Sequence, residues 1–401
     1  MLGNYGDEGK GLATNYFSKA ANGKVLNVLY SSGPQRGHTV NFQNGFSYVF
    51  HHFGSGSPSG ADTFFDRRFL VNPMVFVKEK TESWFINPFM NVFIDPRCRV
   101  TTPYDMFINQ IVETYRGANK HGSCGYGCWE TIRRYDGRFD FNFGQLCKLN
   151  YVELRNYLDN IRHLYFHDCL KDYGIDNLME FDREHNTEYL KLVMDDGILE
   201  HYVEDFLFMK DMCKQTLFED IAPQYETVVF EGSQGLAING SKEKAYPYVT
   251  VDDIGCKFPF ESLARLNTAP QDIEVCYITR PYFTRHGAGP FETECPKDEI
   301  NPDMEDATNT KNPFQDSLRY GKFDCDAFCV RICEDIDPAK DAKVSIFVTQ
   351  LNYTDNKIVD IHGDIPINDF ARICHYKIGD NLKHIYTSAS KFGDDVKTIK
   401  V

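Results

Sequence analysis

Two glycine-rich segments near the start of the chain carry side chains that could move a phosphoryl group. Residues 3–11 read GNYGDEGKG, and residues 33–39 read GPQRGHT. Glycines let a backbone approach phosphate oxygens closely, and the ammonium of Lys10 can offset their negative charge. Asp7 supplies a carboxylate and His38 an imidazole, two groups that commonly exchange protons in enzymes. The sequence therefore predicts that the two segments meet around a phosphate.

The first segment differs from the Walker A phosphate-binding loop. Asn4 stands where that motif has its first glycine, and Gly11 follows Lys10 where the motif has the Ser or Thr that holds magnesium. A carboxylate is an alternative oxygen ligand for Mg²⁺. We therefore expect Asp7 to bind Mg²⁺, and the pattern argues against a plain P-loop NTPase or kinase.

The composition limits the classes of partner. The 401 residues include 43 Lys and Arg against 58 Asp and Glu, which gives a net charge of −15. An acidic chain repels nucleic acid phosphates and anionic membranes. No apolar run approaches the roughly 18 residues of a membrane span. The 13 scattered cysteines are typical of a reducing cytosol. We expect a cytoplasmic protein with small-molecule substrates, no nucleic acid and no membrane.

Short apolar runs alternate with helix-like segments along the chain. Polar or glycine-rich residues bound each run, as in the buried strands of a parallel sheet. Strands that alternate with helices predict an α/β fold with a mostly parallel sheet. The predicted strands are 24–30, 226–231, 273–280 and 343–349, and the predicted helices are 151–167 and 199–218.

Two of the predicted strands are followed at once by candidate binding loops. GSQG follows the strand at 226–231, and QLNY follows the strand at 343–349. Ligands bind at the carboxyl ends of parallel strands. We found no linker between domains, so residues 1–401 are predicted to form a single domain. Its mobile loops are expected near 31–39, 54–62, 120–138 and 296–320.

Cys325, Cys329 and Cys333 recur every four residues, which is the spacing of one helix face. Cysteine packs well as a small apolar side chain. A zinc site usually shows paired CxxC ligands or added histidines, which this segment lacks. We interpret the three cysteines as part of the buried face of a helix.

Five motifs occur in the same order as in the adenylosuccinate synthetase family. They are GDEGKG, GHT, EGSQG, YPYVT and TRHGAGPF, and the resemblance extends from residue 3 to about residue 390. It implies one large α/β domain with helices on both faces of a long, mostly parallel central sheet. It also implies a ligase in which a nucleoside triphosphate phosphorylates O6 of a 6-oxopurine nucleotide such as IMP. The amine of L-aspartate then displaces that phosphate and forms a C–N bond. The resemblance further implies Mg²⁺ as a cofactor and a homodimer as the assembly.

The resemblance assigns roles residue by residue. Asp7 is implied as the base that takes the proton from purine N1, and His38 as the donor to O6 and the transferring phosphoryl group. Asp7 and the carbonyl of Gly37 are implied as Mg²⁺ ligands. The nucleoside triphosphate is expected to contact Glu8, Gly9, Lys10, Gly11, Gly37, Thr39, Gln350, Asn352 and Ser388. The purine monophosphate is expected to contact Gln35, Ser123, Cys124, Arg134, Gln234, Thr250 and His286. The amino acid is expected to contact Thr308, Lys311 and Arg319.

Two of these positions carry further expectations. In the family an arginine from the partner subunit completes the monophosphate site, and Arg134 or its neighbour Arg133 is the candidate here. Asn352 stands where the family has an aspartate that reads guanine, and residues 387–390 read TSAS where the family has STGP. An amide offers both a donor and an acceptor, so it can read an adenine edge. We therefore expect ATP or dATP rather than GTP as the phosphoryl donor.

Other departures leave the substrates open. Pro34 is also found in phage enzymes of the family that use dGMP and adenine donors. Those enzymes have a smaller residue in place of the catalytic aspartate, whereas this chain keeps Asp7. Arg36 replaces a small residue next to the base pocket. Residues 308–324 keep only Arg319 and the closing RYGKFD of the loop that clamps aspartate in the family. Loss of bidentate arginines weakens recognition of a dicarboxylate, so an amine donor other than aspartate is an alternative.

The sequence thus supports one main function and two alternatives. The main one is a ligase of the adenylosuccinate synthetase type that uses an IMP-like nucleotide and ATP. The first alternative is a phage-type 2-amino-2'-deoxyadenylosuccinate synthetase that uses dGMP in the host cytoplasm. The second is a non-catalytic relative that binds purine nucleotides. The altered arginine loop favours that relative, and the intact Asp7, Lys10 and His38 oppose it.

Overall fold

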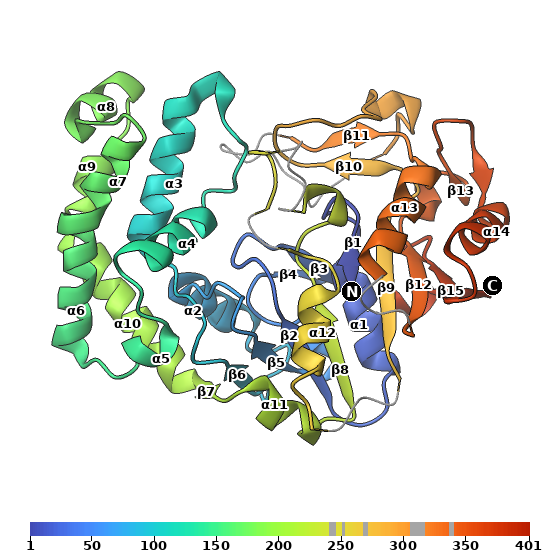
Figure 1. Cartoon of the computed structure of the whole chain (residues 1–401), viewed down its shortest axis with the longest axis horizontal. Coiled ribbons are helices and arrows are strands. Elements are labelled where there is room, and N and C mark those ends of the chain that lie inside the picture. The colour runs from blue at the N-terminus through green and yellow to red at the C-terminus, as the bar shows by residue number, and fades with distance from the viewer. Residues whose placement is uncertain (240–245, 251–252, 268–271, 305–316, 337–340) are drawn as a thin grey trace.

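The four predicted strands all form in the computed structural model of the chain (Figure 1). They are β2 (Val25–Leu29), β8 (Thr227–Glu231), β9 (Glu274–Thr279) and β12 (Lys343–Val348). The structure describes residues 1–239, 246–250, 253–267, 272–304, 317–336 and 341–401.

Two five-stranded sheets lie edge to edge in the described part of the chain. The strand order in the first is β7 (Cys213–Gln215), β6 (Val92–Ile94), β5 (Asp62–Phe65), β2 and β8. The order in the second is β1 (Leu2–Gly3), β9, β12, β15 (Leu382–Thr387) and β16 (Lys397–Lys400). Neighbouring strands are parallel except β15 and β16.

The edges of the two sheets meet at β8 and β1. The nitrogen of Met1 donates to the carbonyl of Phe230 at 2.8 Å, and Gly3 forms a parallel bridge with Gly235. The result is one long, mostly parallel sheet, as predicted. The assignment of residues 1–401 to a single domain stays a prediction.

Three two-stranded antiparallel sheets accompany the long sheet in the described residues, and two of them carry predicted site residues. His38 begins the first, and Arg319 begins the second strand of the next. The pairs are β3 (His38–Asn41) with β4 (Ser47–Phe50), β10 (Phe283–Arg285) with β11 (Arg319–Gly321), and β13 (Lys357–Ile358) with β14 (Ile365–Pro366).

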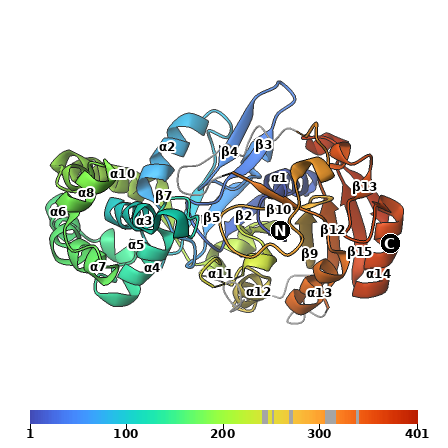
Figure 2. The same cartoon turned by 90° about the horizontal axis from the view of Figure 1, so that it is seen from above.

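The helices divide into groups along the sheet. Those between β6 and β7 lie together at one end of the molecule in both views (Figures 1 and 2). They are α3 (Pro103–Arg116), α4 (Cys128–Gly137), α5 (Phe143–Leu146), α6 (Tyr151–Asn160), α7 (His167–Asp172), α8 (Leu178–His185), α9 (Tyr189–Val193) and α10 (Asp196–Met212). The others are α1 (Lys10–Ala20), α2 (Pro73–Ser83), α11 (Phe218–Ile221), α12 (Lys257–Leu263), α13 (Cys325–Ile336) and α14 (Ile367–Ile378).

Buried apolar side chains form two large cores, and the second also includes residues of β2, β5 and β6. One core joins β2, β5 and β6 to α2, α3 and α10, and the other joins β9, β12 and β15 to α13 and α14. Burial of this apolar surface holds the helices against the sheet. No helix in the described ranges combines the length and apolar character needed to cross a bilayer.

The predicted helices form with one change of boundary. Residues 151–167 are helical throughout, because a π-helical turn at Ile161–Phe166 joins α6 to α7. The helix predicted over 199–218 is wrong at its end, since α10 stops at Met212. Residues Cys213–Gln215 instead form β7, which pairs with β6. Pairing with a distant strand overrides local helix propensity here.

Candidate active site

The first glycine-rich loop, between β1 and α1, is folded around its own Glu8. The Glu8 carboxylate accepts hydrogen bonds from the backbone nitrogens of Asn4 (2.7 Å), Tyr5 (2.7 Å) and Gly6 (3.1 Å). Burial raises the pKa of this carboxyl group, and the nearby ammonium of Lys10 acts in the opposite direction. Glu8 therefore shapes the loop from inside, whereas the sequence assigned it to the triphosphate.

The two segments that the sequence singled out do pack against each other. A Cβ atom added at Gly11 in α1 would lie 2.5 Å from the carbonyl oxygen of Thr39 and 3.0 Å from the carbonyl carbon of His38. Only a glycine fits such an approach. Gly9 has φ +91°, and its added Cβ would lie 2.8 Å from Thr349 Cγ2 at the end of β12. The first loop is thus held between the start of β3 and the carboxyl end of β12.

His38 is held by a carboxylate that the sequence analysis did not select. Its Nδ1 atom lies 2.6 Å from Oε1 of Glu231, the last residue of β8. Arg36 Nη2 donates to the same oxygen at 3.0 Å, and the backbone nitrogen of Ser55 donates to the other oxygen at 3.0 Å. The three side chains of His38, Glu231 and Arg36 are all buried. Glu231 is the first residue of the EGSQG motif. Its position at the carboxyl end of a predicted strand could have identified it as a site residue from the sequence.

The charges in this cluster decide its protonation. Burial opposes ionisation of Glu231, but Arg36 and the hydrogen bond from His38 outweigh it and lower the pKa of the carboxyl group to about 2. Burial and the Arg36 charge lower the pKa of His38 to about 4, against the pull of Glu231. An ionised carboxylate only accepts hydrogen bonds. Nδ1 of His38 therefore carries the hydrogen that faces Glu231.

Asp7 is held by a guanidinium and an imidazole from the segment after β9. Arg280 Nη2 lies 3.2 Å from Asp7 Oδ2, and His286 Nε2 lies 3.7 Å from the same oxygen. Arg280 Nε also donates to the backbone carbonyl of Asp7 at 2.7 Å. Burial opposes ionisation, but Arg280 and His286 lower the pKa of Asp7 well below its usual value. Sequence reasoning missed Arg280, although it closes a predicted strand.

Other motifs meet beside Asp7. A Cβ atom added at Gly122 would lie 2.7 Å from Cα of Gly287, so the HGSCGYG and TRHGAGPF loops are in contact. The rings of His121 and Tyr248 lie 5.4 Å apart and bring in the YPYVT segment. The EGSQG segment touches the first loop, because a Cβ atom added at Gly6 would lie 3.5 Å from Gln234 Oε1. His286 and Gln234 thus lie close to the first loop.

The predicted monophosphate residues Ser123, Cys124 and Thr250 differ in their contacts. Glu113 holds the loop before them by accepting from the backbone nitrogens of Gly122 and Ser123 at 2.8 and 3.3 Å. Ser123 Oγ donates to Asn109 Oδ1 at 3.1 Å. Burial raises the pKa of Cys124 to about 11, so its thiol stays neutral. The backbone nitrogen of Thr250 donates to the Ile238 carbonyl at 2.9 Å.

The predicted donor-base residues gather at the carboxyl ends of β12 and β15. Gln350 has φ +56°, and its Oε1 accepts from the Tyr282 hydroxyl at 2.6 Å. The backbone nitrogen of Leu351 donates to the Ser388 carbonyl at 3.1 Å, which joins the two loops. Asn352 is exposed next to them. Gln350 and Asn352 therefore lie in a loop that contacts the buried Ser388, and their role in binding the donor base stays a prediction.

Arg134 requires a correction. Its guanidinium is buried on α4 and binds both oxygens of Asp105 at 2.8 and 3.0 Å. It also donates to the carbonyls of Val100 and Phe139 at 2.7 and 3.0 Å. These four contacts fix the helical layer within one chain, so they would have to break before the side chain could bind a phosphate in a partner subunit. Arg133 is likewise paired within the chain, with Asp172 at 2.6 Å.

The predicted amino acid site is described only in part. Arg319 lies against the TRHGAGPF loop, where its Nη1 donates to the carbonyls of Gly287 (3.1 Å) and Gly289 (2.9 Å). Its Nε donates to Glu294 at 2.8 Å. Recognition of a dicarboxylate by Arg319 would have to displace Glu294. Thr308 and Lys311 lie outside the described residues. Gln35 is half-buried and Gly37 exposed, beside the buried Arg36.

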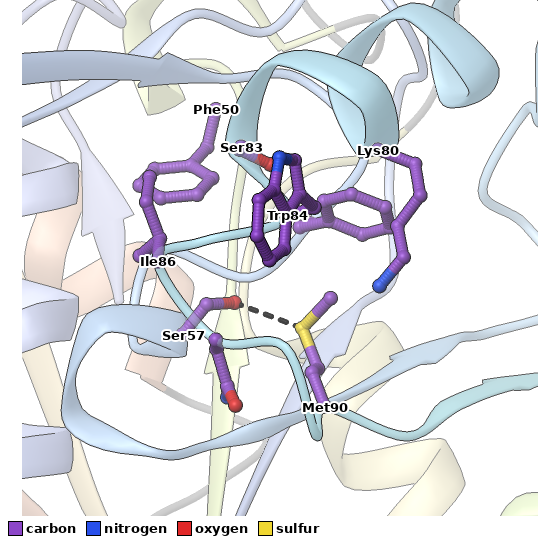
Figure 3. Close-up of a pocket in the computed structure, with 9 residues that line it drawn as sticks. Phe50, Ser57, Lys80, Ser83, Trp84, Ile86 and Met90 are labelled. Atoms are coloured by element: carbon purple, nitrogen blue, oxygen red, sulfur yellow. Dashed lines mark hydrogen bonds between the residues drawn. The ribbon is translucent and has the colours of Figure 1, made fainter.

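The segment at 54–62, predicted as a mobile loop, is packed close to the Glu231 cluster. Its residues are largely buried, and the backbone nitrogens of Gly54 and Gly56 donate to Thr63 Oγ1 (2.9 Å) and Asn27 Oδ1 (2.8 Å). A small cavity beside it lies next to the end of α2, where Ser57 Oγ lies 3.1 Å from Met90 Sδ (Figure 3).

A larger cavity, of about 550 Å³, lies at the amino ends of β2 and β5. Neither it nor the small cavity in Figure 3 is lined by Asp7 or His38. Ligands of parallel sheets bind at the opposite, carboxyl ends of the strands. We therefore place the candidate active site between the first loop, β3 and the segment after β9, where Asp7 and His286 are partly exposed.

Comparisons with known proteins show the family of the chain. The chain is 27% identical over 340 residues to the adenylosuccinate synthetase of Bacillus subtilis, an alignment that covers 80% of this chain and 70% of that one. It is 29% identical over 299 residues to the Brevibacillus brevis adenylosuccinate synthetase, covering 72% of this chain and 63% of the relative. The chain thus spans about two thirds of the length of these relatives.

Two solved structures share the fold. A fully ligated adenylosuccinate synthetase from Plasmodium falciparum matches with a TM-score of 0.69 and 16% identity, over 100% of this chain and 99% of that one. The cyanophage S-2L succinoaminodeoxyadenylate synthetase, bound to dGMP and dATP, matches with a TM-score of 0.59 and 16% identity, over 98% and 92%. A family model described as adenylosuccinate synthetase matches residues 2–331, well over half of the sequence. The chain therefore belongs to the adenylosuccinate synthetase family.

Proposed function

We propose that the protein joins the amine of L-aspartate to C6 of a 6-oxopurine nucleoside monophosphate of the IMP type, with ATP as phosphoryl donor. In the first step the purine loses its N1 proton, O6 attacks the γ-phosphorus, and ADP leaves. In the second step the aspartate amine attacks C6, inorganic phosphate leaves, and the nitrogen loses a proton. The observation that carries the proposal is the close packing of the loop with Asp7 against the segment with His38, through Gly11 and Thr39.

Asp7 is the proposed base for the N1 proton. Arg280 and His286 keep it ionised, so it can accept a proton only when a substrate is positioned against it. The contacts from Arg280 and His286 both involve Oδ2, so Oδ1 and the carbonyl of the exposed Gly37 are the atoms that would hold Mg²⁺. A bound Mg²⁺ would offset the charge of the phosphate oxygens.

His38 is the proposed donor to O6 and the transferring phosphoryl group. Its Nδ1 side is taken by Glu231, so Nε2 is the atom that would meet the substrate. Nε2 is buried and makes no hydrogen bond within the described residues. Glu231 fixes the ring orientation, and Arg36 fixes Glu231. We therefore assign positioning roles to Glu231 and Arg36.

The direct test incubates the protein with a purine monophosphate, a nucleoside triphosphate and L-aspartate, and identifies the products by mass spectrometry. We expect an N6-succinyl purine nucleotide, ADP and phosphate. Asp7→Asn should abolish the product while binding of the nucleotides persists. Binding without any product in the wild-type protein would instead identify the chain as a non-catalytic nucleotide-binding relative.

A second candidate function is the same ligation on dGMP with an adenine donor. Pro34, which the resemblance shares with the dGMP-using phage enzymes, favours it, whereas Asn352 fits an adenine donor in either function. The printed ligands of the cyanophage relative, dGMP and dATP, point the same way. Competition between IMP, GMP and dGMP in one reaction decides between the two functions. A preference for dGMP by tenfold or more in kcat/KM would replace the IMP proposal.

The homodimer implied by the resemblance also stays a proposal. Arg134 pairs with Asp105 of its own chain. The arginine that a partner subunit would contribute to the monophosphate site is therefore not identified. Light scattering during size-exclusion chromatography measures the oligomeric state directly, and a monomer that retains full activity would contradict the proposal.

A further inference from the structure

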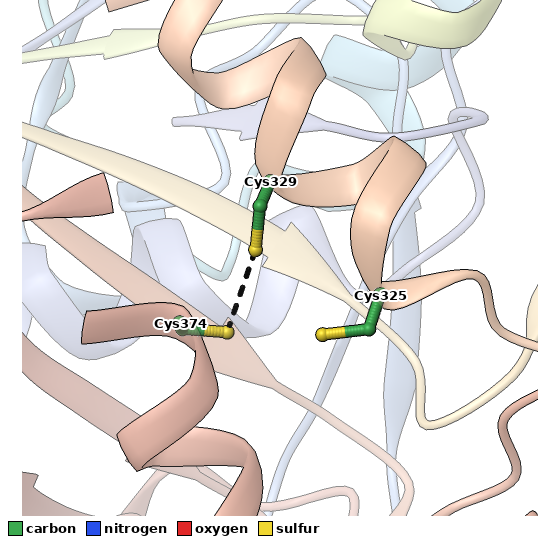
Figure 4. Close-up of side chains that lie close together, drawn as sticks. All are labelled: Cys325, Cys329 and Cys374. Carbon is green, nitrogen blue, oxygen red and sulfur yellow. Dashed lines mark hydrogen bonds between the residues drawn. The ribbon is translucent and has the colours of Figure 1, made fainter. Parts of the chain in front are cut away.

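Three buried thiols converge where α13 packs against α14 (Figure 4). Cys325 and Cys329 lie one turn apart on α13, and Cys374 lies on α14. Their sulfur atoms all lie within 4.8 Å of one another, and the sulfurs of Cys329 and Cys374 are 3.9 Å apart. The three residues are 6%, 1% and 0% exposed. The sequence showed only the helical pair, because Cys374 is 45 residues from Cys329.

The sulfur spacing suits a shared metal ion. With metal–sulfur bonds of about 2.3 Å, sulfurs bound to one ion lie about 3.8 Å apart in a tetrahedral site and about 4.0 Å apart in a trigonal one. The 3.9 Å between Cys329 and Cys374 falls between these values. A disulfide would need the sulfurs to approach to about 2.05 Å. The arrangement therefore needs less movement to bind a metal than to form a disulfide.

One of the three cysteines lies where a thiolate is favoured. Cys325 is the first residue of α13, and the partial positive charge of a helix N-terminus stabilises a thiolate. Lys377 on α14 places an ammonium beside the cluster through its pair with Asp326 at 2.7 Å. Three thiolates with one divalent cation carry a net charge of −1, and the Lys377–Asp326 pair adds no net charge to it. Burial within the apolar core around Phe323 and Phe370 excludes competing water ligands.

We propose that Cys325, Cys329 and Cys374 bind one thiophilic cation, Zn²⁺ or Cu⁺, that crosslinks α13 to α14. Thiolates select these ions over Mg²⁺ and other cations that prefer oxygen ligands. Within the described ranges no fourth His, Cys, Asp or Glu joins the three, so a trigonal or open tetrahedral site is expected. The role is structural, because Arg331 on the same helix donates to Asn4 Oδ1 of the first loop at 2.8 Å. A metal that fixes α13 would thereby steady that loop.

The test uses the reduced wild-type protein under anaerobic conditions and does not depend on catalytic activity. Metal content is measured after dialysis against one equivalent of Zn²⁺ or of Cu⁺ in separate arms. We expect one ion per chain, and substitution with Co²⁺ should give a thiolate-to-cobalt charge-transfer band. The ion that the protein binds with the higher affinity is the cation of this site. The absence of a bound ion in both arms would overturn the proposal.

Matched variants locate the ion. Cys329→Ala keeps the packing apolar and should weaken binding at least tenfold. Cys333→Ala removes the exposed thiol one turn further along α13 and should leave the stoichiometry unchanged. If Cys329→Ala does not fold, Cys374→Ala provides the same comparison. Equal binding by the wild type and the variants at Cys329 and Cys374, or a disulfide between two of the three cysteines in the isolated protein, would contradict the site.

Discussion

Nδ1 of His38 lies 2.6 Å from Oε1 of Glu231, and the two residues are 193 positions apart in the chain. The contact joins the start of β3 to the end of β8. Because Arg36 binds the same carboxylate oxygen, the imidazole is held in a network that excludes water. The orientation of the proposed acid is therefore set by a residue that the motifs at the start of the chain do not contain.

Glu231→Gln should lower turnover about 10- to 100-fold, as expected when a hydrogen-bond partner of a proton-transfer group is altered. The neutral amide no longer requires a hydrogen on Nδ1, so His38 can turn or change tautomer. If Glu231 acts through His38, adding Glu231→Gln to His38→Asn should change turnover little further. If the fold loss in turnover of the double variant equals the product of the two single losses, Glu231 does not act through His38.

The controls separate positioning from folding. Glu226→Gln, at the residue just before β8, should leave turnover unchanged. Thermal melting of each variant shows whether the loss of the Arg36–Glu231 ion pair has unfolded the protein instead.

Gly11→Ala should disrupt the contact between the two glycine-rich segments. The added Cβ would meet the Thr39 carbonyl oxygen at 2.5 Å, so α1 or β3 must move. We expect a loss of at least 100-fold in kcat/KM and a lower melting temperature. Gly137→Ala is the matched control, because no atom lies within 4 Å of its added Cβ, and it should be neutral or stabilising by up to about 1 kcal/mol. Full activity in Gly11→Ala would show that the close approach is not needed.

Asn352→Asp should shift the donor preference from ATP towards GTP. A carboxylate accepts the two N–H groups of guanine but offers no donor to the adenine edge. We expect the ratio of kcat/KM for GTP to that for ATP to rise about tenfold, on the order of one charged hydrogen bond. Steady-state kinetics with both donors gives the ratio, and an unchanged ratio would remove Asn352 from base recognition.

Glu130→Gln should change how stability depends on pH. Burial on α4 raises the pKa of Glu130 to about 7, although the Tyr173 hydroxyl donates to it at 2.8 Å. A carboxyl group whose pKa is raised in the folded state adds stability below the unfolded pKa and loses that contribution as pH rises towards 7.

The amide introduced by Glu130→Gln keeps an acceptor for Tyr173 but does not titrate. The unfolding free energy of this variant relative to wild type should therefore rise by about 1 to 3 kcal/mol between pH 5 and pH 8. Urea titrations at the two pH values measure this difference, and parallel curves would contradict the raised pKa.

Arg134→Met should destabilise the fold without changing nucleotide recognition. It leaves Asp105 buried without its guanidinium, a change that costs about 3 to 5 kcal/mol. Below the melting temperature of the variant, KM for the purine monophosphate should stay within twofold of the wild-type value. A rise of tenfold or more at unchanged stability would restore Arg134 to the monophosphate site.

The sequence by itself determined the class of fold and the order of the motifs. Apolar runs bounded by polar residues located β2, β8, β9 and β12, because burial on both faces of a parallel sheet requires such runs. The predicted approach of Gly9 and Gly11 to phosphate stays a prediction, and in the structure the two glycines give room to the Thr349 side chain and the Thr39 carbonyl. These features depend on local composition, which a single sequence displays.

Only the tertiary structure decided which charges face each other. Glu231, Arg280 and Cys374 come to His38, Asp7 and Cys329 from distant segments. Arg134, expected in a partner's site, is instead used by Asp105 within its own helical layer. A buried charge takes the partner that the packing of helices and strands brings to it. That packing depends on contacts between residues far apart in the chain, and local patterns do not encode them.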